Sequence, residues 1–70
     1  MPKEHILPVA AMERLLKLGG ADRVSEDAKI ALRSILEEYT QGLAEEASKL
    51  ARHAGRKTVR AADLRLASKK

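Results

Sequence analysis

Residues 25–54 read SEDAKIALRSILEEYTQGLAEEASKLARHA, and this stretch decides the fold of the 70-residue chain. Apolar residues recur along it in steps of three and four, without a proline, which is the spacing of one helix face. They are Ala28, Leu32, Ile35, Leu36, Tyr39, Leu43, Ala47, Leu50, Ala51 and Ala54. Ser25 is a suitable N-cap and Gly55 a suitable stop signal. We therefore expect one long helix from Ser25 to Ala54.

The length of this helix predicts the oligomeric state. Thirty helical residues span about 45 Å, whereas a compact globule of this chain length has a diameter of roughly 28 Å. Two short flanking segments cannot cover the apolar stripe along that length, so a second copy must. We expect an obligate dimer whose long helices cross near Tyr39–Leu43. Gly42 would allow close backbone approach there; the alternative is a glycine that only weakens an exposed turn.

A short helix is expected on each side of the long one. Pro8 suits the first turn of a helix that Gly19-Gly20 ends. A last helix starts near Arg60, and its expected buried face is Ala61, Leu64 and Ala67, with Leu66 off that stripe. The predicted organisation is a flexible segment at 1–6 that includes His5, one domain at 7–68 and a loose end at 69–70. The predicted fold class is all-α.

The charge distribution favours a polyanionic partner. The net charge is +4, but residues 51–70 carry seven cations and one acid, whereas residues 25–50 carry six acids and three cations. Cations therefore gather toward the C-terminus while the middle of the chain is acidic. The alternative is a solvated surface without a partner.

Composition excludes several function classes. Without cysteine, neither disulfides nor a thiolate metal site is available. One tyrosine, with no Phe or Trp, argues against stacking on single-stranded nucleic acid. The longest apolar run, 6–12, is too short to span a bilayer and lacks the flanks of a signal peptide, so a cytoplasmic protein is expected.

The sequence contains no arrangement of residues typical of catalysis. His5 and His53 lie too far apart for a local metal site. Gly19-Gly20 is too short for a nucleotide-binding phosphate loop. The acidic pairs Glu37-Glu38 and Glu45-Glu46 are interpreted as solvated helix surface. We expect a protein that is not an enzyme and that needs neither a metal nor a cofactor.

The stretch LARHAGRKTVRAAD at 50–63 combines a helix end, a short basic loop and a new helix start. Such a corner brings backbone N–H groups and cations together, and it grips phosphates without reading bases. This stretch resembles the second loop of the archaeal histones. The likeness continues in LPVA at 7–10, GADRVSEDA at 20–28 and LEE at 36–38, and covers roughly residues 7–67.

The resemblance implies the histone fold and a handshake homodimer that binds the backbone and minor groove of double-stranded DNA. It places Arg23 in the minor groove with Thr58 holding it, Lys57 on a phosphate, and Arg14, Lys17 and Arg60 along the DNA path. A guanidinium suits the narrow, negative minor groove, and wrapping needs spaced cations rather than base contacts. The implied location is the nucleoid, and no membrane is involved.

The resemblance also implies contacts that brace the protein and join dimers. Arg56 and Asp63 would form an internal ion pair; the alternative is two exposed charges of little energetic value. Dimers would join through a four-helix bundle, and Gly20 would permit close stacking of layers. The residues assigned to that dimer–dimer interface are Leu50, His53, Asp63 and Leu66, with His53 bonding to an Asp63 across it. The alternative for His53 is a residue that only complements the helix dipole.

Two other functions are compatible with the sequence. The last helix is short and, with Ala62 and Arg65, unusually basic. This favours a handshake module acting as one half of a heterodimer or as a cap that ends histone arrays. A helix-turn-helix regulator is less favoured, because no polar base-reading set lines a helix N-terminus.

Overall fold

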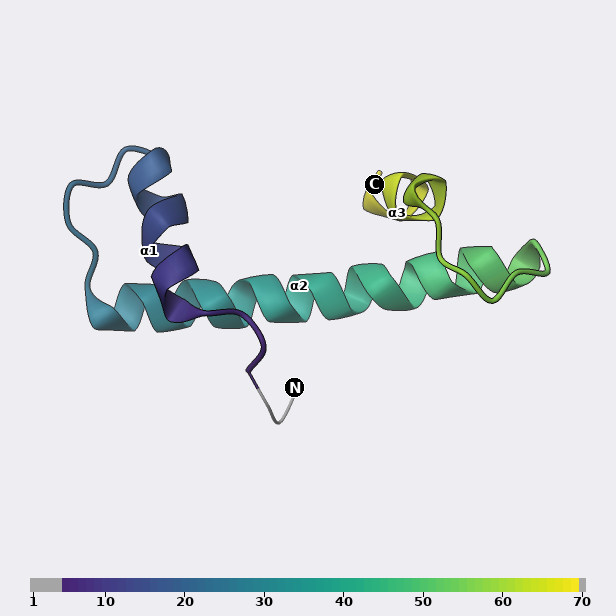
Figure 1. Cartoon of the computed structure of the whole chain (residues 1–70), viewed down its shortest axis with the longest axis horizontal. Helices are drawn as coiled ribbons and strands as arrows, with labels where there is room; N and C mark the ends of the chain where they lie inside the picture. Colours follow the sequence, from purple (N-terminus) through teal and green to yellow (C-terminus); the bar gives the residue numbers. More distant parts are fainter. Residues whose placement is uncertain (1–4, 70) are drawn as a thin grey trace. The chain divides into compact units, whose positions relative to one another are not determined.

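The computed structural model describes residues 5–69, and this part of the chain is all-α (Figure 1). Helix α1 is Val9–Leu18, α2 is Glu26–His53 and α3 is Ala61–Ser68. The order short, long, short is the one predicted, so the fold class is confirmed. Residues 1–4 and 70, which include parts of the predicted flexible ends, lie outside the described residues.

Local signals set the ends of the helices. The Ser25 hydroxyl accepts the N–H of Ala28 at 3.1 Å, which caps α2 as predicted. Both C-termini close by the same motif, in which a glycine with positive φ follows the helix: Gly20 (φ 112°) after α1 and Gly55 (φ 73°) after α2. At α2 the N–H of Gly55 bonds to the Arg52 carbonyl and that of Arg56 to the Ala51 carbonyl, both at 2.9 Å.

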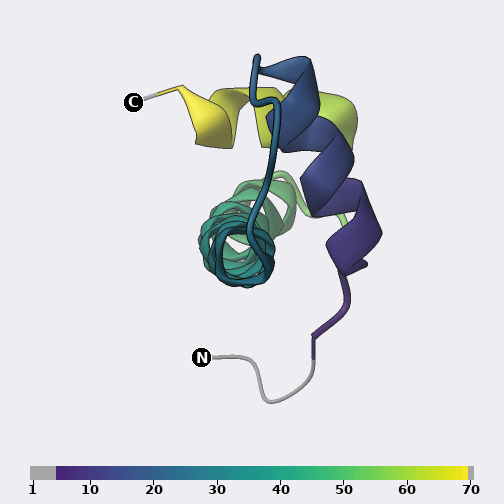
Figure 2. The ribbon, with the colours of Figure 1, turned by 90° about the vertical axis from the view of Figure 1, so that its left-hand side faces the viewer.

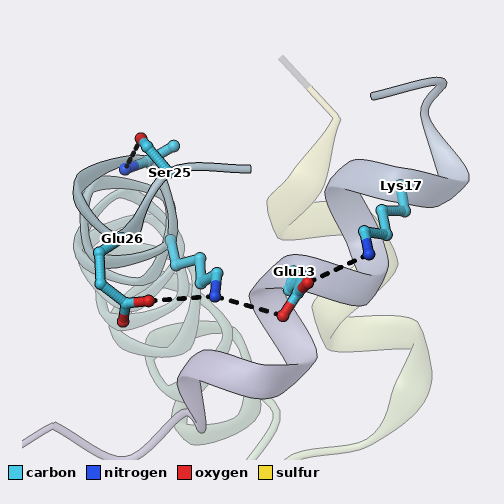
Figure 3. Close-up of polar contacts among 6 residues, drawn as sticks. Glu13, Lys17, Ser25 and Glu26 are labelled. Atoms are coloured by element: carbon cyan, nitrogen blue, oxygen red, sulfur yellow. Dashed lines mark hydrogen bonds and ion pairs between the residues drawn. The ribbon is translucent and has the colours of Figure 1, made fainter. Parts of the chain in front are cut away.

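The chain divides into two compact units, Met1–Glu38 and Tyr39–Lys70, with the division inside α2. In the first unit α1 packs across the N-terminal part of α2 (Figure 2), and Met12 is its buried apolar residue. The ammonium group of Lys29 on α2 lies 3.2 Å from the carboxylate of Glu13 on α1 and 3.1 Å from that of Glu26 (Figure 3). This ion pair therefore joins the two helices of the unit.

The second unit packs α3 on the C-terminal part of α2. Ala47 and Ala51 of α2 are buried, together with Asp63 and Ala67 of α3. Of the predicted inward stripe of α3, Ala67 is buried within one copy, whereas Ala61 is exposed and Leu64 is 40% exposed there. Within one copy the paired Asp63 carboxylate is also buried, a position that the predicted stripe did not include.

One copy of the chain leaves large apolar side chains uncovered. On α2, Ile30, Ile35 and Tyr39 are exposed, the last two by 63% and 59%, and on α3 Leu66 is 60% exposed. The exposure of apolar side chains of this size is unfavourable in water. None of the described helices is both long and apolar enough to cross a membrane.

Candidate nucleic-acid interface

The loop between α2 and α3, residues 54–60, is braced from inside by Arg56. Its guanidinium donates to both carboxylate oxygens of Asp63, each at 3.0 Å, and also to the Thr58 carbonyl at 3.0 Å. A bidentate pair of this kind fixes orientation as well as distance. The guanidinium therefore holds the loop backbone at Thr58 against the start of α3.

Asp63 serves the loop and the helix start at once. Besides the Arg56 pair, its Oδ2 accepts the backbone N–H of Arg60 at 2.8 Å, which caps the first turn of α3. The residue is only 6% exposed. The Arg56 guanidinium first and the Arg60 N–H second lower the pKa of Asp63 from 3.8 to about 2. A charged carboxylate is thus fixed at the base of the loop.

The side chains around this brace face solvent. Lys57, Thr58 and Arg60 are exposed, and neither cation forms an ion pair with a described residue. Lys57 and Thr58 directly follow Arg56 in the loop, before Asp63, to which Arg56 is bonded. Arg60 is the N-cap residue of α3. Within the described part of the chain the loop therefore presents two unpaired cations and a hydroxyl, on a backbone that hydrogen bonds of Arg56 hold.

The first unit holds the other predicted DNA-binding residues. Arg14 on α1 and Arg23 in the 19–25 loop are exposed. Neither arginine forms an ion pair with a described residue. Lys17 lies 3.1 Å from the Glu13 carboxylate on its own helix (Figure 3). Its charge is therefore partly compensated by that of Glu13. The pKa of Glu13 is lowered by Lys17 and then by Lys29.

Gly20 has a reason of its own to be glycine. Its φ of 112° is a backbone conformation that L side chains rarely adopt, and it lets the N–H of Ala21 reach the Leu16 carbonyl. The termination of α1 is by itself a sufficient reason for glycine at position 20. The predicted role of Gly20 in stacking stays a separate prediction.

The residues predicted to join dimers have different environments. Leu50 is half-buried, whereas His53, the last residue of α2, and Leu66 are exposed. Asp63 is buried, and its oxygens already accept three hydrogen bonds within the chain. A histidine of another copy would have to use the second lone pair of Oδ1, which accepts only one of them.

Sequence reasoning missed one polar cluster. The interpretation of Glu37 as solvated helix surface was wrong: the residue is 9% exposed. Its Oε2 accepts the backbone N–H of Ile6 at 2.7 Å and of Leu7 at 2.9 Å, and its Oε1 lies 2.8 Å from Nδ1 of His5. These bonds, that of Leu7 first, lower the pKa of Glu37 from 4.5 to about 2.

The Glu37 cluster ties the entry of α1 to α2. His5 and Ile6, which were predicted to be flexible, are described and bonded here. Neither the apolar pattern nor the spacing of charges signals these bonds, because two of the donors are backbone groups about 30 residues away in sequence. No group of three or more His, Cys, Asp or Glu side chains that would hold a metal occurs among the described residues.

The succession of helices, with a capped loop on either side of the long one, is that of the histone fold. Residues 5–67 match the family model described as histone-like transcription factor (CBF/NF-Y) and archaeal histone. The chain belongs to this family, and within it to the archaeal histones. Archaeal histones are architectural DNA-binding proteins that dimerise, and they are not enzymes.

Two relatives illustrate this membership. An archaeal histone HAN1 subunit from Thermococcus zilligii is 56% identical over 63 residues, which are 90% of this chain and 94% of the relative. Probable archaeal histone 3 of Methanocaldococcus jannaschii is 46% identical over 61 residues, which are 87% of this chain and 91% of the relative.

Proposed function

We propose that this protein wraps and compacts double-stranded DNA, largely without regard to sequence, as homodimers that join into longer assemblies on the chromosome. The observation that carries the proposal is the braced loop, in which Arg56 and Asp63 fix a backbone that presents Lys57, Thr58 and Arg60 outward. Family membership supplies the class of ligand.

Each exposed residue has a defined part in this proposal. Lys57 and Arg60 contact phosphates, and Thr58 holds the Arg23 side chain of the partner copy where it enters the minor groove. Phosphate contacts position a protein on DNA without specifying sequence, and an arginine suits a narrow minor groove. Arg14 extends the path along α1, with Lys17 as a weaker member because of Glu13.

The exposed apolar residues of α2 support the dimer. Ile35 and Tyr39 are exposed and lie near the middle of α2, where the two long helices are proposed to cross. A Cβ placed on Gly42 would meet no heavy atom within 4 Å in the same chain, so the space beside it is open to a second copy. In the proposed longer assemblies Leu50, His53 and Leu66 form the contact between dimers, and Gly20 faces the next layer.

Nuclease digestion of long DNA saturated with the protein tests this function. The test variant is Arg23→Ala combined with Lys57→Ala, and the control is Lys49→Ala combined with Arg52→Ala, which removes the same charge from the exposed side of α2. We expect evenly spaced protected fragments from the wild-type and control proteins, and none from the test variant, whose dimer stays folded.

Other results would contradict the proposal. A single short protected fragment would favour a cap that ends arrays or a protein that needs another histone as its partner, in accord with the shortness of α3. Protection by the test variant equal to that of the wild type would remove Arg23 and Lys57 from the interface. No protection by the wild-type protein would reject DNA wrapping.

A further inference from the structure

Helix α3 carries a second cationic surface, separate from the braced loop. Asp63 is the only acid in residues 54–69, and it is buried and paired with Arg56. Arg65 and Lys69 are exposed, and neither forms an ion pair with a described residue. No carboxylate on α3 is left to compensate their charge.

The direction of this surface follows from helix geometry. Asp63 and Ala67 are the buried residues of α3. Arg65 lies two positions from each, which is about 200° around a helix of 3.6 residues per turn, so it lies on the opposite side. Lys69, the C-cap residue directly after the helix, follows four positions later and begins near the same side. We call this side, Arg65 and Lys69 together with the small residues Ala61 and Ala62, the α3 outer face.

The apolar residues of α3 leave this face free. Leu64 and Leu66 are 40% and 60% exposed, and each lies about 80° to one side of the inward stripe. The flank with Leu66 is the one proposed to contact another dimer. Because Arg65 lies between the two flanks on the outer side, packing against Leu64 and Leu66 does not bury it.

We propose that the α3 outer face binds the phosphate backbone of a second DNA duplex, so that an assembly on one duplex bridges to another. This inference rests on the proposed function. Two copies of a surface that carries only cations repel each other, which disfavours a second α3 outer face as the occupant. Arg65 and Lys69 also lie about 7 and 13 Å beyond Arg60 along the helix axis, away from the loop that holds the first duplex.

A two-duplex capture experiment tests the bridging. One duplex is immobilised, protein is added to equal occupancy, and retention of a second, fluorescent duplex is measured. The test variant is Arg65→Ala with Lys69→Ala, and the charge-matched control is Lys49→Ala with Arg52→Ala. Alanine at exposed positions on or near helices preserves folding.

We expect the test variant to retain the second duplex at least about fivefold less than wild type, while its affinity for one duplex stays within about twofold with an unchanged salt dependence. The control variant should retain the second duplex as wild type does. An Arg65→Glu variant should abolish second-duplex capture.

Each other outcome overturns the inference. Equal loss in test and control variants would show a net-charge effect without a site. A shallower salt dependence on one duplex would place Arg65 and Lys69 on the first duplex. If the test variant captured the second duplex as wild type does but compacted a single DNA molecule less tightly, the α3 outer face would instead bind an acidic protein surface. If the wild-type protein bound the immobilised duplex but did not capture the second one, only the bridging would be rejected. If it did not bind the immobilised duplex, the proposed function would be rejected.

Discussion

The carboxylate of Glu37, in the middle of α2, accepts the backbone N–H of Leu7 at 2.9 Å. The same carboxylate accepts the N–H of Ile6 and bonds to the ring of His5, so one buried acid fixes the three residues that lead into α1. Pro8 follows directly as the N-cap residue of α1. The start of α1 is thus positioned by a side chain about 30 residues further along the chain.

Replacing Glu37 by glutamine should destabilise the folded protein. The amide is neutral, so its oxygen accepts the N–H groups of Ile6 and Leu7 in weaker hydrogen bonds than the charged carboxylate does, and the ionic contact with the His5 ring is lost. We expect a Tm lower by about 5 °C in thermal unfolding of the dimer. Glu38→Gln is the matched control, because Glu38 is exposed; equal Tm values for the two variants would contradict the role of Glu37.

Stability should fall in acid because of two carboxylates. The pKa of Glu37 is lowered from 4.5 to about 2 and that of Asp63 from 3.8 to about 2. Since both pKa values are lower in the folded state, their contribution is fully present above the unfolded values and is lost as pH falls from about 4.5 to about 2. Urea unfolding between pH 6 and pH 2 measures this. Glu37→Gln with Asp63→Asn should flatten the acid limb, and an unchanged slope would contradict the assignment.

Replacing Arg56 by lysine should separate bracing from charge. Lysine keeps the charge but cannot form the bidentate pair with Asp63 and also reach the Thr58 carbonyl. We expect DNA affinity to fall several-fold while the slope of log affinity against log salt concentration stays unchanged. The same titration of Lys57→Ala should instead show a slope shallower by about one per protomer. Matching slopes in the two variants would reject the bracing role.

Replacing Tyr39 by glutamate should disrupt the dimer. The exposed Tyr39 ring lies on the apolar side of α2 that a second copy is proposed to cover, and an unpaired carboxylate there would be buried on association. We expect helix content to become concentration-dependent, measured by circular dichroism together with sedimentation. Leu18→Glu is the control, because Leu18 is 83% exposed at the end of α1. Dimerisation unaffected by Tyr39→Glu would move the crossing elsewhere.

The braced loop was predictable only in part. The sequence indicated a basic corner after the long helix, and the resemblance paired Arg56 with Asp63. It did not indicate that the guanidinium also bonds to the Thr58 carbonyl or that Asp63 caps α3, since both depend on the path of the backbone between the two residues. The DNA contacts of Arg23, Lys57 and Thr58 stay predictions.

The sequence by itself determined the three helices, the start of α2 and the ends of α1 and α2. The reasons are local: apolar residues at helical spacing, the Ser25 hydroxyl within reach of the Ala28 N–H, and glycines at the two positions where φ must be positive. Each of these signals acts over four or five residues, so neighbours in sequence suffice to predict the result.

Only the tertiary structure decided which charged side chains are buried. From the sequence Glu37 was interpreted as a surface acid, and Asp63 was paired with Arg56 only through the resemblance; burial of a carboxylate is unfavourable unless donors satisfy it. The donors are the N–H groups of Ile6 and Leu7 for one and the Arg56 guanidinium with the Arg60 N–H for the other. Folding brings them to the carboxylates, and for Glu37 the distance in sequence is too long for any local pattern to show it.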